Sequence, residues 1–437
     1  MEDYLSWGRW PQVKQQVRRI EWRGDLLPDP LGRSLLPRGL GRSYGDSCLN
    51  ADNVLLDARG LNRFIQFDPE SGILQCEGGV SFDAILRLIV PRGWFLPVVP
   101  GTKLITIAGA IANDIHGKNH HTKGTFGCHV TAFELLRSDG TRRVCARDQN
   151  PELFRATIGG LGLTGLITWA EVQLLRIKSA WIDMQTIRFG DLSEFFPISK
   201  ESNERFDYTV AWVDFTATGK ATGRGHFIRG NHSEQGNLAV HRPPKVSVPV
   251  EFPNWALNPM SVHAFNLVYY HRQLKRVKAS HSHYEPFYFP LDMVGDWNRI
   301  YGRRGFFQYQ CVVPYEGDLG CIKEIVSRIA RSRQGSFLAV LKTFGKIPSP
   351  GLLSFPQPGV TVALDFSHSG AGVINLMEEL DRVVESAGGR LYPAKDSRMS
   401  AAGFQRMYPQ WRELSKWIDP AFSSSFWRRV TVPQVNA

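Results

Sequence analysis

The sequence lacks several features that would assign a protein to a broad class at once. It has no apolar run of about 18 residues, so no membrane-spanning helix is expected. Its six cysteines include no Cys-x-x-Cys pair, so we expect reduced cysteines and neither a disulfide framework nor a structural metal site. The first residues show no basic stretch followed by an apolar one, so no signal peptide is expected. Internal repeats and low-complexity segments are also missing from the sequence.

Positive charge, in contrast, is in excess. The 437 residues include 52 Lys and Arg against 41 Asp and Glu, a formal net charge of +11. This balance favours anionic partners, namely nucleic acid, anionic lipid or a phosphorylated substrate, although a basic surface without a specific partner would give the same balance. The sequence shows no helix-turn-helix pattern, RNP signature or zinc spacing, so a nucleic-acid partner is not expected.

The length predicts two large lobes, because domains usually hold about 100–200 residues. Turn signals and alternating apolar residues in the first 180 residues predict hairpins around residues 68–72 and around Asp139-Gly140. Ser81 is an expected helix cap, because apolar residues follow it at helical spacing and Pro91 ends the pattern. Strands mixed with helices in this order favour an α+β lobe. The remaining expected elements of this lobe are strands at 53–57 and 166–175 and a short helix at 151–158.

From about Trp181 onward, the chain becomes richer in long aromatic strands. These are expected at 208–215, 306–313 and 360–366, with helices near 319–331 and 372–387. The pattern predicts a second lobe, a sheet covered by helices. Residues 271–283 are rich in lysine, arginine and histidine, and two interpretations remain open: a solvated loop, or a flap that faces phosphate or a membrane. The basic and histidine residues concerned are His263, His271, Arg272, Lys275, Arg276, Lys278, His281 and His283.

Two glycine-rich segments are the sharpest local features. The first, residues 37–46 (PRGLGRSYGD), predicts a tight loop whose backbone N–H groups cradle a pyrophosphate, although an ordinary glycine-rich turn also fits. The second, residues 100–117, is an apolar run of small residues that lets the backbone approach a ligand closely. His116, His120 and His121 follow this run at once, but no cysteine or carboxylate cluster accompanies them, so a metal site is not expected.

A third glycine loop resembles a nucleotide-binding motif in an unsuitable context. Residues 160–165 (GLGLTG) match G-x-G-x-x-G, which requires a preceding strand and a following helix. Here a helix is expected before the motif and a strand after it. We therefore do not predict a Rossmann NAD site, and we expect these glycines to press against a different ligand.

The three loops together resemble the FAD-binding domain of the vanillyl-alcohol-oxidase (PCMH-type) superfamily. Within it, the chain is similar to the decaprenylphosphoryl-β-D-ribose 2′-oxidase family over about residues 7 to 420. The strings that carry this similarity are RGLGRSYGD (38–46), DIHGKNHH (114–121), YFPLDMVGDWN (288–298), QYQ (308–310) and RLYPAKDSR (390–398).

The resemblance implies an FAD-binding domain at 1–179, an inserted substrate-binding domain at 180–388, and a return to the FAD-binding domain at 389–437. It implies catalytic roles for Lys395, His116, Tyr288 and Gln310, with His116 beside the flavin ring and Lys395 between flavin and sugar. The sugar pocket would be lined by Tyr288, Gln308, Gln310, Lys342 and Lys395. The implied FAD contacts are Arg38, Gly39, Leu40, Gly41, Arg42, Ser43, Tyr44, Gly45, Asp46, Gly101, Thr106, Ile107, Ala108, Gly109, Asn113, Asp114, Ile115, His116, Gly117, Ile167 and Tyr392.

The chain departs from the family pattern in two places. Ala363 stands where the mycobacterial members carry a pocket cysteine, so reagents that attack that thiol should fail here. Residues 260–284 also differ strongly, which leaves the recognition of a lipid open. The flavin is expected to be non-covalent, because the first loop lacks the histidine that tethers it in some relatives.

The implied reaction is FAD-dependent oxidation of the 2′-hydroxyl of a polyprenylphosphoryl-β-D-ribose to a 2′-keto sugar, with a separate NAD(P)H-dependent reductase completing epimerisation to arabinose. Lys395 would accept the hydroxyl proton or stabilise the alkoxide, although it could also serve only to bind the flavin. Lys275, Arg276 or Lys278 would meet the prenyl phosphate. The rival function is oxidation of free alditols or sugar lactones on the same fold. We expect a cytoplasmic protein peripheral to the inner membrane, with the periplasmic side also open.

Overall fold

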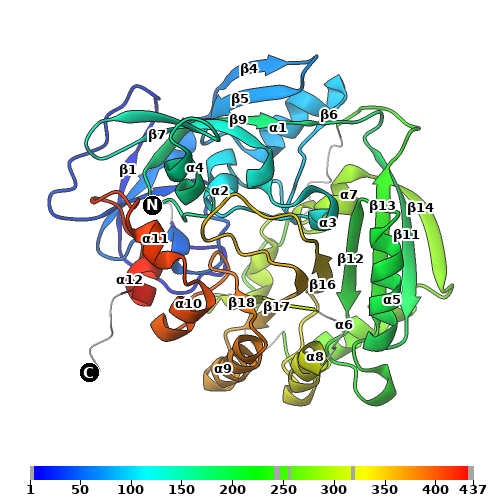
Figure 1. Cartoon of the computed structure of the whole chain (residues 1–437). Coiled ribbons are helices and arrows are strands. Elements are labelled where there is room, and N and C mark those ends of the chain that lie inside the picture. Colours follow the sequence, from blue (N-terminus) through cyan, green and yellow to red (C-terminus); the bar gives the residue numbers. More distant parts are fainter. Residues whose placement is uncertain (1–3, 241–246, 254–256, 316–319, 432–437) are drawn as a thin grey trace.

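The computed structural model describes residues 4–240, 247–253, 257–315 and 320–431, and two large sheets dominate it (Figure 1). One sheet has five strands from the first 180 residues, and the other has eight strands from later in the chain. Both helices and strands occur in each part, so the expected α+β class is confirmed. No helix within these residue ranges is long and apolar enough to cross a membrane.

A small parallel sheet begins the fold, in the order β1-β3-β2. The central strand β3 is buried along its whole length and confirms the strand expected at 53–57. The chain leaves β2 directly into the first glycine loop, so this sheet fixes where that loop starts. The bounds are β1 (Gln16–Arg19), β2 (Leu35–Arg38) and β3 (Val54–Asp57).

The five-stranded sheet is antiparallel, in the order β4-β5-β9-β7-β8. Its hairpins β4–β5 and β7–β8 confirm the two turns expected from the sequence. Two short strands, β6 (Trp94–Phe95) and β10 (Leu175–Arg176), form a separate antiparallel pair. The main strands are β4 (Phe64–Asp68), β5 (Ile73–Glu77), β7 (Val130–Leu136), β8 (Arg142–Ala146) and β9 (Leu166–Gln173).

Two helices of this part, α1 and α4, form where the sequence predicts them. The Ser81 side chain accepts a hydrogen bond from the backbone N–H of Ala84 at 3.1 Å, which caps the first turn of α1 (Phe82–Ile89). The apolar residues of α1 recur at helical spacing, so one face is buried. The others are α2 (Ile107–Ala112), α3 (His120–Lys123) and α4 (Pro151–Thr157), of which α4 was expected.

The eight-stranded sheet has the order β14-β11-β13-β12-β16-β17-β15-β18. Strand β15 coincides with the expected strand at 306–313, and β12 and β17 confirm the other two within two residues. The strands are β11 (Trp181–Phe189), β12 (Tyr208–Val213), β13 (Gly225–His232), β14 (Val277–His283), β15 (Phe306–Val313), β16 (Ala339–Phe344), β17 (Gly359–Ser367) and β18 (Arg390–Leu391).

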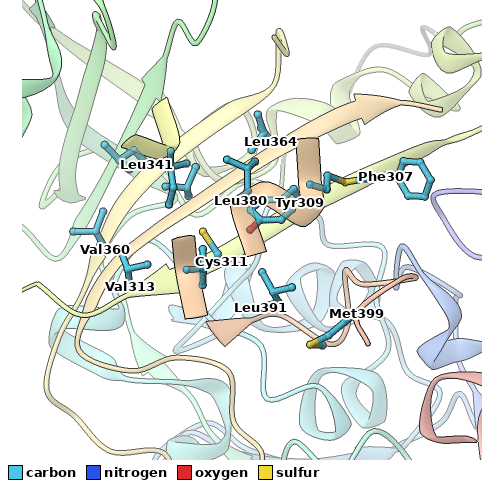
Figure 2. Close-up of a cluster of buried hydrophobic side chains, with 14 of the residues drawn as sticks. Phe307, Tyr309, Cys311, Val313, Leu341, Val360, Leu364, Leu380, Leu391 and Met399 are labelled. Carbon is cyan, nitrogen blue, oxygen red and sulfur yellow. The ribbon is translucent and has the colours of Figure 1, made fainter. Parts of the chain in front are cut away.

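Alternation along these strands divides the sheet into a core face and a cavity face, because successive side chains of a strand point to opposite sides. Figure 2 shows the core face, where Tyr309 and Cys311 of β15 pack with Leu364 of β17 and Leu380. This core face packs against three helices, two of which were expected from the sequence, near 319–331 and 372–387. Residue 319 lies outside the described residues. These helices are α5 (Leu192–Asn203), α8 (Gly320–Ser332) and α9 (Ala371–Ser386).

The C-terminal segment links the two parts of the chain. After β18 joins the large sheet, Phe422 bridges to Leu35 of β2. Arg429 pairs with Asp46 of the first glycine loop and with Asp396, at 2.8 and 2.9 Å. The helices involved are α10 (Ala401–Met407), α11 (Trp411–Ser415) and α12 (Ser425–Thr431).

The segment at 271–283 is a loop only at 272–276, and the loop interpretation is wrong for residues 277–283, which form a strand. Helix α6 (Pro259–His271) leads into edge strand β14, and α7 (Tyr284–Tyr288) follows at once. Strand β14 pairs with β11 over seven residues, so backbone pairing orders a stretch whose composition suggests a loop (Figure 1). Its side chains remain largely exposed, as the sequence suggests.

Candidate active site

A cavity of about 740 Å³ lies between the glycine loops and the second face of the large sheet. This volume is in the range of sites for cofactors and drug-sized ligands. The first half of the chain supplies backbone-rich loops, and the second half supplies side chains from β12, β13, β15, β16 and β17. The three glycine segments singled out in the sequence therefore meet at one site.

Most of the residues that the resemblance assigns to FAD line this cavity. The exceptions are Gly45, Asp46, Ile107 and Asp114, which do not line it. The residues that do are Arg38, Gly39, Leu40, Gly41, Arg42, Ser43, Tyr44, Gly101, Thr106, Ala108, Gly109, Asn113, Ile115, His116, Gly117, Ile167 and Tyr392.

The four exceptions have structural contacts within the protein. Asp46 is buried against Arg429, and Ile107 belongs to the hydrophobic core. Asp114 accepts hydrogen bonds from the hydroxyls of Ser349 and Ser354 and from the N–H of Gly127. Gly45 is packed so closely that a Cβ would lie 1.7 Å from the carbonyl oxygen of Asp396. The contacts of these residues stabilise the loops that carry the cavity wall.

The loop walls fit a long, phosphate-bearing cofactor such as FAD. Added side-chain atoms would collide at Gly39, where a Cβ would lie 2.3 Å from Thr106 Oγ1, and Gly41 has a positive φ of 63°. Buried polar atoms without a partner among the described residues occur along the same wall: Arg38 Nε, Ser47 Oγ and His116 Nδ1. Because buried polar groups are nearly always hydrogen-bonded, these atoms are available to a bound group.

Three half-buried lysines line the cavity. Burial lowers the pKa of Lys118, Lys342 and Lys395 to about 7 in each case. For Lys395 the charge of Asp365 opposes this effect, whereas Lys342 adds to it. The Lys395 ammonium lies over the Tyr44 ring, 3.8 Å from its centroid. An anionic ligand would stabilise the charged form of all three, whereas a neutral ligand would favour release of protons.

A polar cluster on β15 and β17 faces the lysines. Gln308 and Asp365 are cross-strand partners, and the Gln308 amide donates to the Asp365 carboxylate at 2.8 Å. Tyr301 OH donates to the same carboxylate at 3.2 Å. Burial nevertheless raises the pKa of Asp365 to about 7. Lys395 and Asp365 therefore both titrate near neutrality and influence each other.

His116 is neutral, because burial and the nearby Lys342 and Lys395 hold its pKa well below the usual value. Its Nε2 lies 3.0 Å from the Gln310 amide nitrogen, which donates to it, so the ring proton resides on the unpartnered Nδ1. Tyr392 packs against the ring and anchors its own hydroxyl on the carbonyl of Asn113 at 2.9 Å. The imidazole is thus fixed in orientation by Gln310 and Tyr392.

Every residue that the resemblance assigns to the sugar pocket lines this cavity. Gln308, Gln310 and Lys342 alternate onto its surface from β15 and β16, and Lys395 approaches from the C-terminal segment. Tyr288 ends α7, where its hydroxyl is 3.5 Å from His232 Nε2. The fold brings these five residues, which are far apart in the sequence, to one cavity.

Two residues of the site were missed from the sequence. Asp365 could have been found by alternation, because it lies two residues beyond Ala363 on the same predicted strand and therefore faces the same way. Lys118 stands inside the quoted histidine string, but no spacing rule indicates that it points into the cavity, near the Phe287 carbonyl that it binds.

The basic residues expected at the pocket mouth do not line it, which corrects that assignment. Lys275 precedes β14 and Lys278 lies on it, and both are exposed. Arg276 is paired with Glu194 at 2.6 Å. Aromatic residues of α6, Phe265 and Tyr269, line the cavity instead.

The glycine motif at 160–165 has the reversed context expected from the sequence. Helix α4 precedes it and β9 follows it, so a Rossmann arrangement is excluded for this motif. Gly162 and Gly165 still line the cavity, with Ile167 just beyond. The loop therefore lines the cavity without forming a Rossmann motif.

Comparison with known proteins agrees with this geometry. A family model described as an FAD binding domain matches residues 30–146. The chain is 37% identical over 415 residues to decaprenylphosphoryl-beta-D-ribose oxidase of Mycolicibacterium smegmatis, covering 91% of this chain and 89% of the relative. An uncharacterized Streptomyces coelicolor protein encoded in the mprA 5′ region is 34% identical over 375 residues, covering 80% of this chain and all of that protein. Delta(24)-sterol reductase of Rattus norvegicus is 30% identical over 126 residues, 29% of this chain and 24% of the reductase.

The first and second relatives span both parts of the fold, whereas the third matches only a short stretch. The likeness to the first therefore includes the second-lobe strands that face the lysines as well as the glycine loops. The chain belongs to the decaprenylphosphoryl-β-D-ribose oxidase family and is an FAD-dependent oxidoreductase.

Proposed function

We propose that this enzyme oxidises the 2′-hydroxyl of a polyprenylphosphoryl-β-D-ribose to the 2′-keto sugar. The observation that carries the proposal is the polar cluster of Gln308, Gln310, Lys342 and Lys395, which meets the glycine-loop wall in one cavity of a chain 37% identical to such an oxidase. A sugar seated against this cluster presents hydroxyl groups to lysine and amide nitrogen atoms.

When bound, the flavin supplies the acceptor for the hydride that leaves the sugar carbon. The protein must then remove the hydroxyl proton, and Lys395 is the group that we assign to this step. Its Nζ accepts the proton when the amine is neutral, which a pKa of about 7 allows in an appreciable fraction of molecules. The C–O bond of the substrate becomes a carbonyl as the proton leaves.

Neighbouring groups position Lys395 and its substrate. Asp365, held by Gln308 and Tyr301, stabilises the ammonium that forms on Lys395. Gln310 fixes the orientation of the His116 ring. Because Asp365, Gln310 and His116 are buried, their interactions are stronger than they would be in solution.

The enzyme would perform the first half of an epimerisation. A keto sugar keeps no configuration at the oxidised carbon, so a separate NAD(P)H-dependent reductase can return hydride to the opposite face and give an arabinose donor for cell-surface polysaccharide. A prenyl-linked substrate also requires contact with a membrane. We therefore propose a peripheral protein at the inner membrane, with its cytoplasmic side as the first candidate.

An anaerobic titration tests the proposal. We expect the flavin absorbance of the purified holoenzyme to bleach on addition of polyprenylphosphoryl ribose, with a 2′-keto sugar as the recovered product. Free ribose, alditols and sugar lactones serve as the comparison. Bleaching by a free alditol or lactone, with none by the lipid-linked sugar, would instead identify an oxidase of free sugars on the same fold.

A further inference from the structure

Helix α6 is attached to the large sheet in an unusual way. Its inward stripe is formed by Val262, Asn266, Tyr269 and Tyr270, at helical spacing. Asn266 is buried and donates to Asp214 and to the carbonyl of Ser336, at 3.0 and 3.1 Å. Polar and aromatic groups thus hold the helix on the protein.

The outward face of the same helix carries exposed apolar side chains together with His263 and His271. Met260 is 83% exposed and Val268 is 71% exposed, and Leu267 lies beside them on this face. Leu274, just beyond the end of the helix, is 82% exposed. A surface helix of a protein surrounded by water normally shows the reverse pattern, with its apolar stripe turned inward. An apolar face of this kind marks an interaction surface.

A basic stretch follows this apolar face in the sequence. Residues 257–284 contain no Asp or Glu, whereas Arg272, Lys275, Arg276 and Lys278 follow the helix within one short stretch. Arg276 is partly neutralised by Glu194, and Arg272 lies over the Tyr269 ring. Lys275 and Lys278 have exposed side chains with no ion pair among the described residues. Exposed apolar residues flanked by basic ones suit the surface of an anionic bilayer.

The apolar face is continuous with the cavity. Phe265 and Tyr269 lie on α6 and also line the cavity. Tyr269 packs on Trp212 at 4.5 Å between ring centroids, and Phe265 packs on Phe337 at 5.6 Å. These rings form an unbroken apolar path between the exposed helix and the sheet face that carries Gln308 and Lys342.

We propose that α6, together with the basic stretch that follows it, is a membrane-docking surface that inserts its outer face into an anionic leaflet. The prenyl chain of the substrate would pass from the bilayer along the aromatic path, while the sugar reaches the polar cluster. The inference rests on the proposed function for the identity of this substrate. The docking itself follows from the composition and exposure of the surface.

Vesicle binding by the full-length holoenzyme tests the apolar half of this proposal. The probe is large unilamellar vesicles of phosphatidylcholine with phosphatidylglycerol, and the variant is Met260→Ser with Val268→Ser. We expect vesicle binding to fall at least tenfold. The matched control is Leu26→Ser with Leu31→Ser, because these side chains are 75% and 81% exposed on another part of the surface. The control should bind as the parent does.

The charged half is tested by Lys275→Ala and Lys278→Ala. Each substitution should weaken binding to the anionic vesicles by about fivefold at low salt, and hardly at all for vesicles of phosphatidylcholine alone. Equal binding of the parent to the two kinds of vesicle would overturn the role of these lysines. Flavin content and melting temperature verify that each variant is folded.

Two further results separate docking from catalysis and from self-association. Turnover of vesicle-embedded substrate should fall more in the α6 variant than turnover of a short-chain, water-soluble analogue. Unchanged vesicle binding in the α6 variant overturns the docking proposal, even where the analogue is oxidised and the proposed function holds. A parent dimer that the α6 substitutions convert to monomer, without an effect on vesicles, would also overturn it and assign the face to a second copy of the chain.

Discussion

The two walls of the cavity differ in the kind of atoms that they present, backbone on one side and side chains on the other. The wall from the first half of the chain is mostly backbone, with glycines where a side chain would collide, as at Gly39 and Gly41. The wall from the second half consists of side chains that alternate from strands, such as Gln308 and Lys342. Backbone donors suit a cofactor that never changes, whereas side chains can be exchanged to suit a substrate.

This difference means that the two walls should fail differently when altered. A side chain added to the first wall should remove the cofactor, and all activity with it. A side chain removed from the second wall should leave the cofactor bound and affect the chemistry. The variants below test whether the two walls have these different roles.

Gly39→Val should have the largest effect. A Cβ at this position would lie 2.3 Å from Thr106 Oγ1, and Thr106 is the residue whose side chain caps α2. Losing that cap costs about 1 kcal/mol and overpacking costs a further 1–3 kcal/mol or so. We expect a lower melting temperature and almost no flavin in the purified protein. Gly24→Val is the control, because nothing lies within 4 Å of a Cβ there; a Gly39→Val protein with full flavin would contradict the assignment of this wall.

Lys395→Ala should keep the flavin but lose about 10²- to 10⁴-fold in the rate of substrate-dependent bleaching, because the proton acceptor is gone. Small primary amines in the buffer should restore part of the rate, which a residue that only binds flavin would not allow. Lys416→Ala, at an exposed site, is the control. Undiminished sugar oxidation would show that Lys395 is no base.

Asp365→Asn should change the pH dependence more than the maximal rate. In the parent, the rate should rise as pH increases through about 7, because neutral Lys395 accepts the proton. The Asp365 carboxylate raises the pKa of Lys395, so its removal lowers that pKa. The acidic limb of the profile should therefore move to lower pH, by about one unit. Glu413→Gln, at an exposed position, should leave the profile in place; a limb that stays put in Asp365→Asn, or moves upward, would contradict the coupling of Asp365 with Lys395.

Ala363→Cys should have the smallest effect on turnover of these variants. Ala363 lies opposite Gln310 on the cavity face of β17, where a thiol adds little volume. The parent should resist thiol-directed inhibitors of the site, whereas the variant should acquire one new labelled cysteine, detectable by mass spectrometry of the digested protein. Site-directed labelling of the parent at another cysteine would show that the missing thiol is not what governs such inhibitors.

The sequence predicted most of the fold where local signals are strong. The Ser81 cap, the turn at Asp139-Gly140 and the strand at 306–313 each depend on neighbouring residues alone, and all were confirmed. Residues 277–283 were harder, because their composition resembles a loop and only pairing with β11 makes them a strand. Long-range pairing of this kind leaves no local trace in the sequence.

The sequence predicts the glycine-loop wall of the site better than the side-chain wall. Glycine loops are contiguous in the sequence, so the resemblance could assign them as strings, although Asp46 and Asp114 turn away from the cavity. Asp365 could have been inferred from alternation once Ala363 was placed. The shared pKa behaviour of Lys395 and Asp365 could not be inferred, because it depends on burial and on separations that only the folded chain defines.

We propose that this enzyme oxidises carbon 2′ of a lipid-linked ribose. Rapid-mixing absorbance under anaerobic conditions tests it most directly, with polyprenylphosphoryl ribose carrying deuterium at carbon 2′ or, separately, at carbon 3′. We expect the flavin to bleach severalfold more slowly with the 2′-deuterated substrate and at the ordinary rate with the 3′-deuterated one. Slowing by 3′-deuterium alone, or no bleaching with either substrate, would contradict the claim.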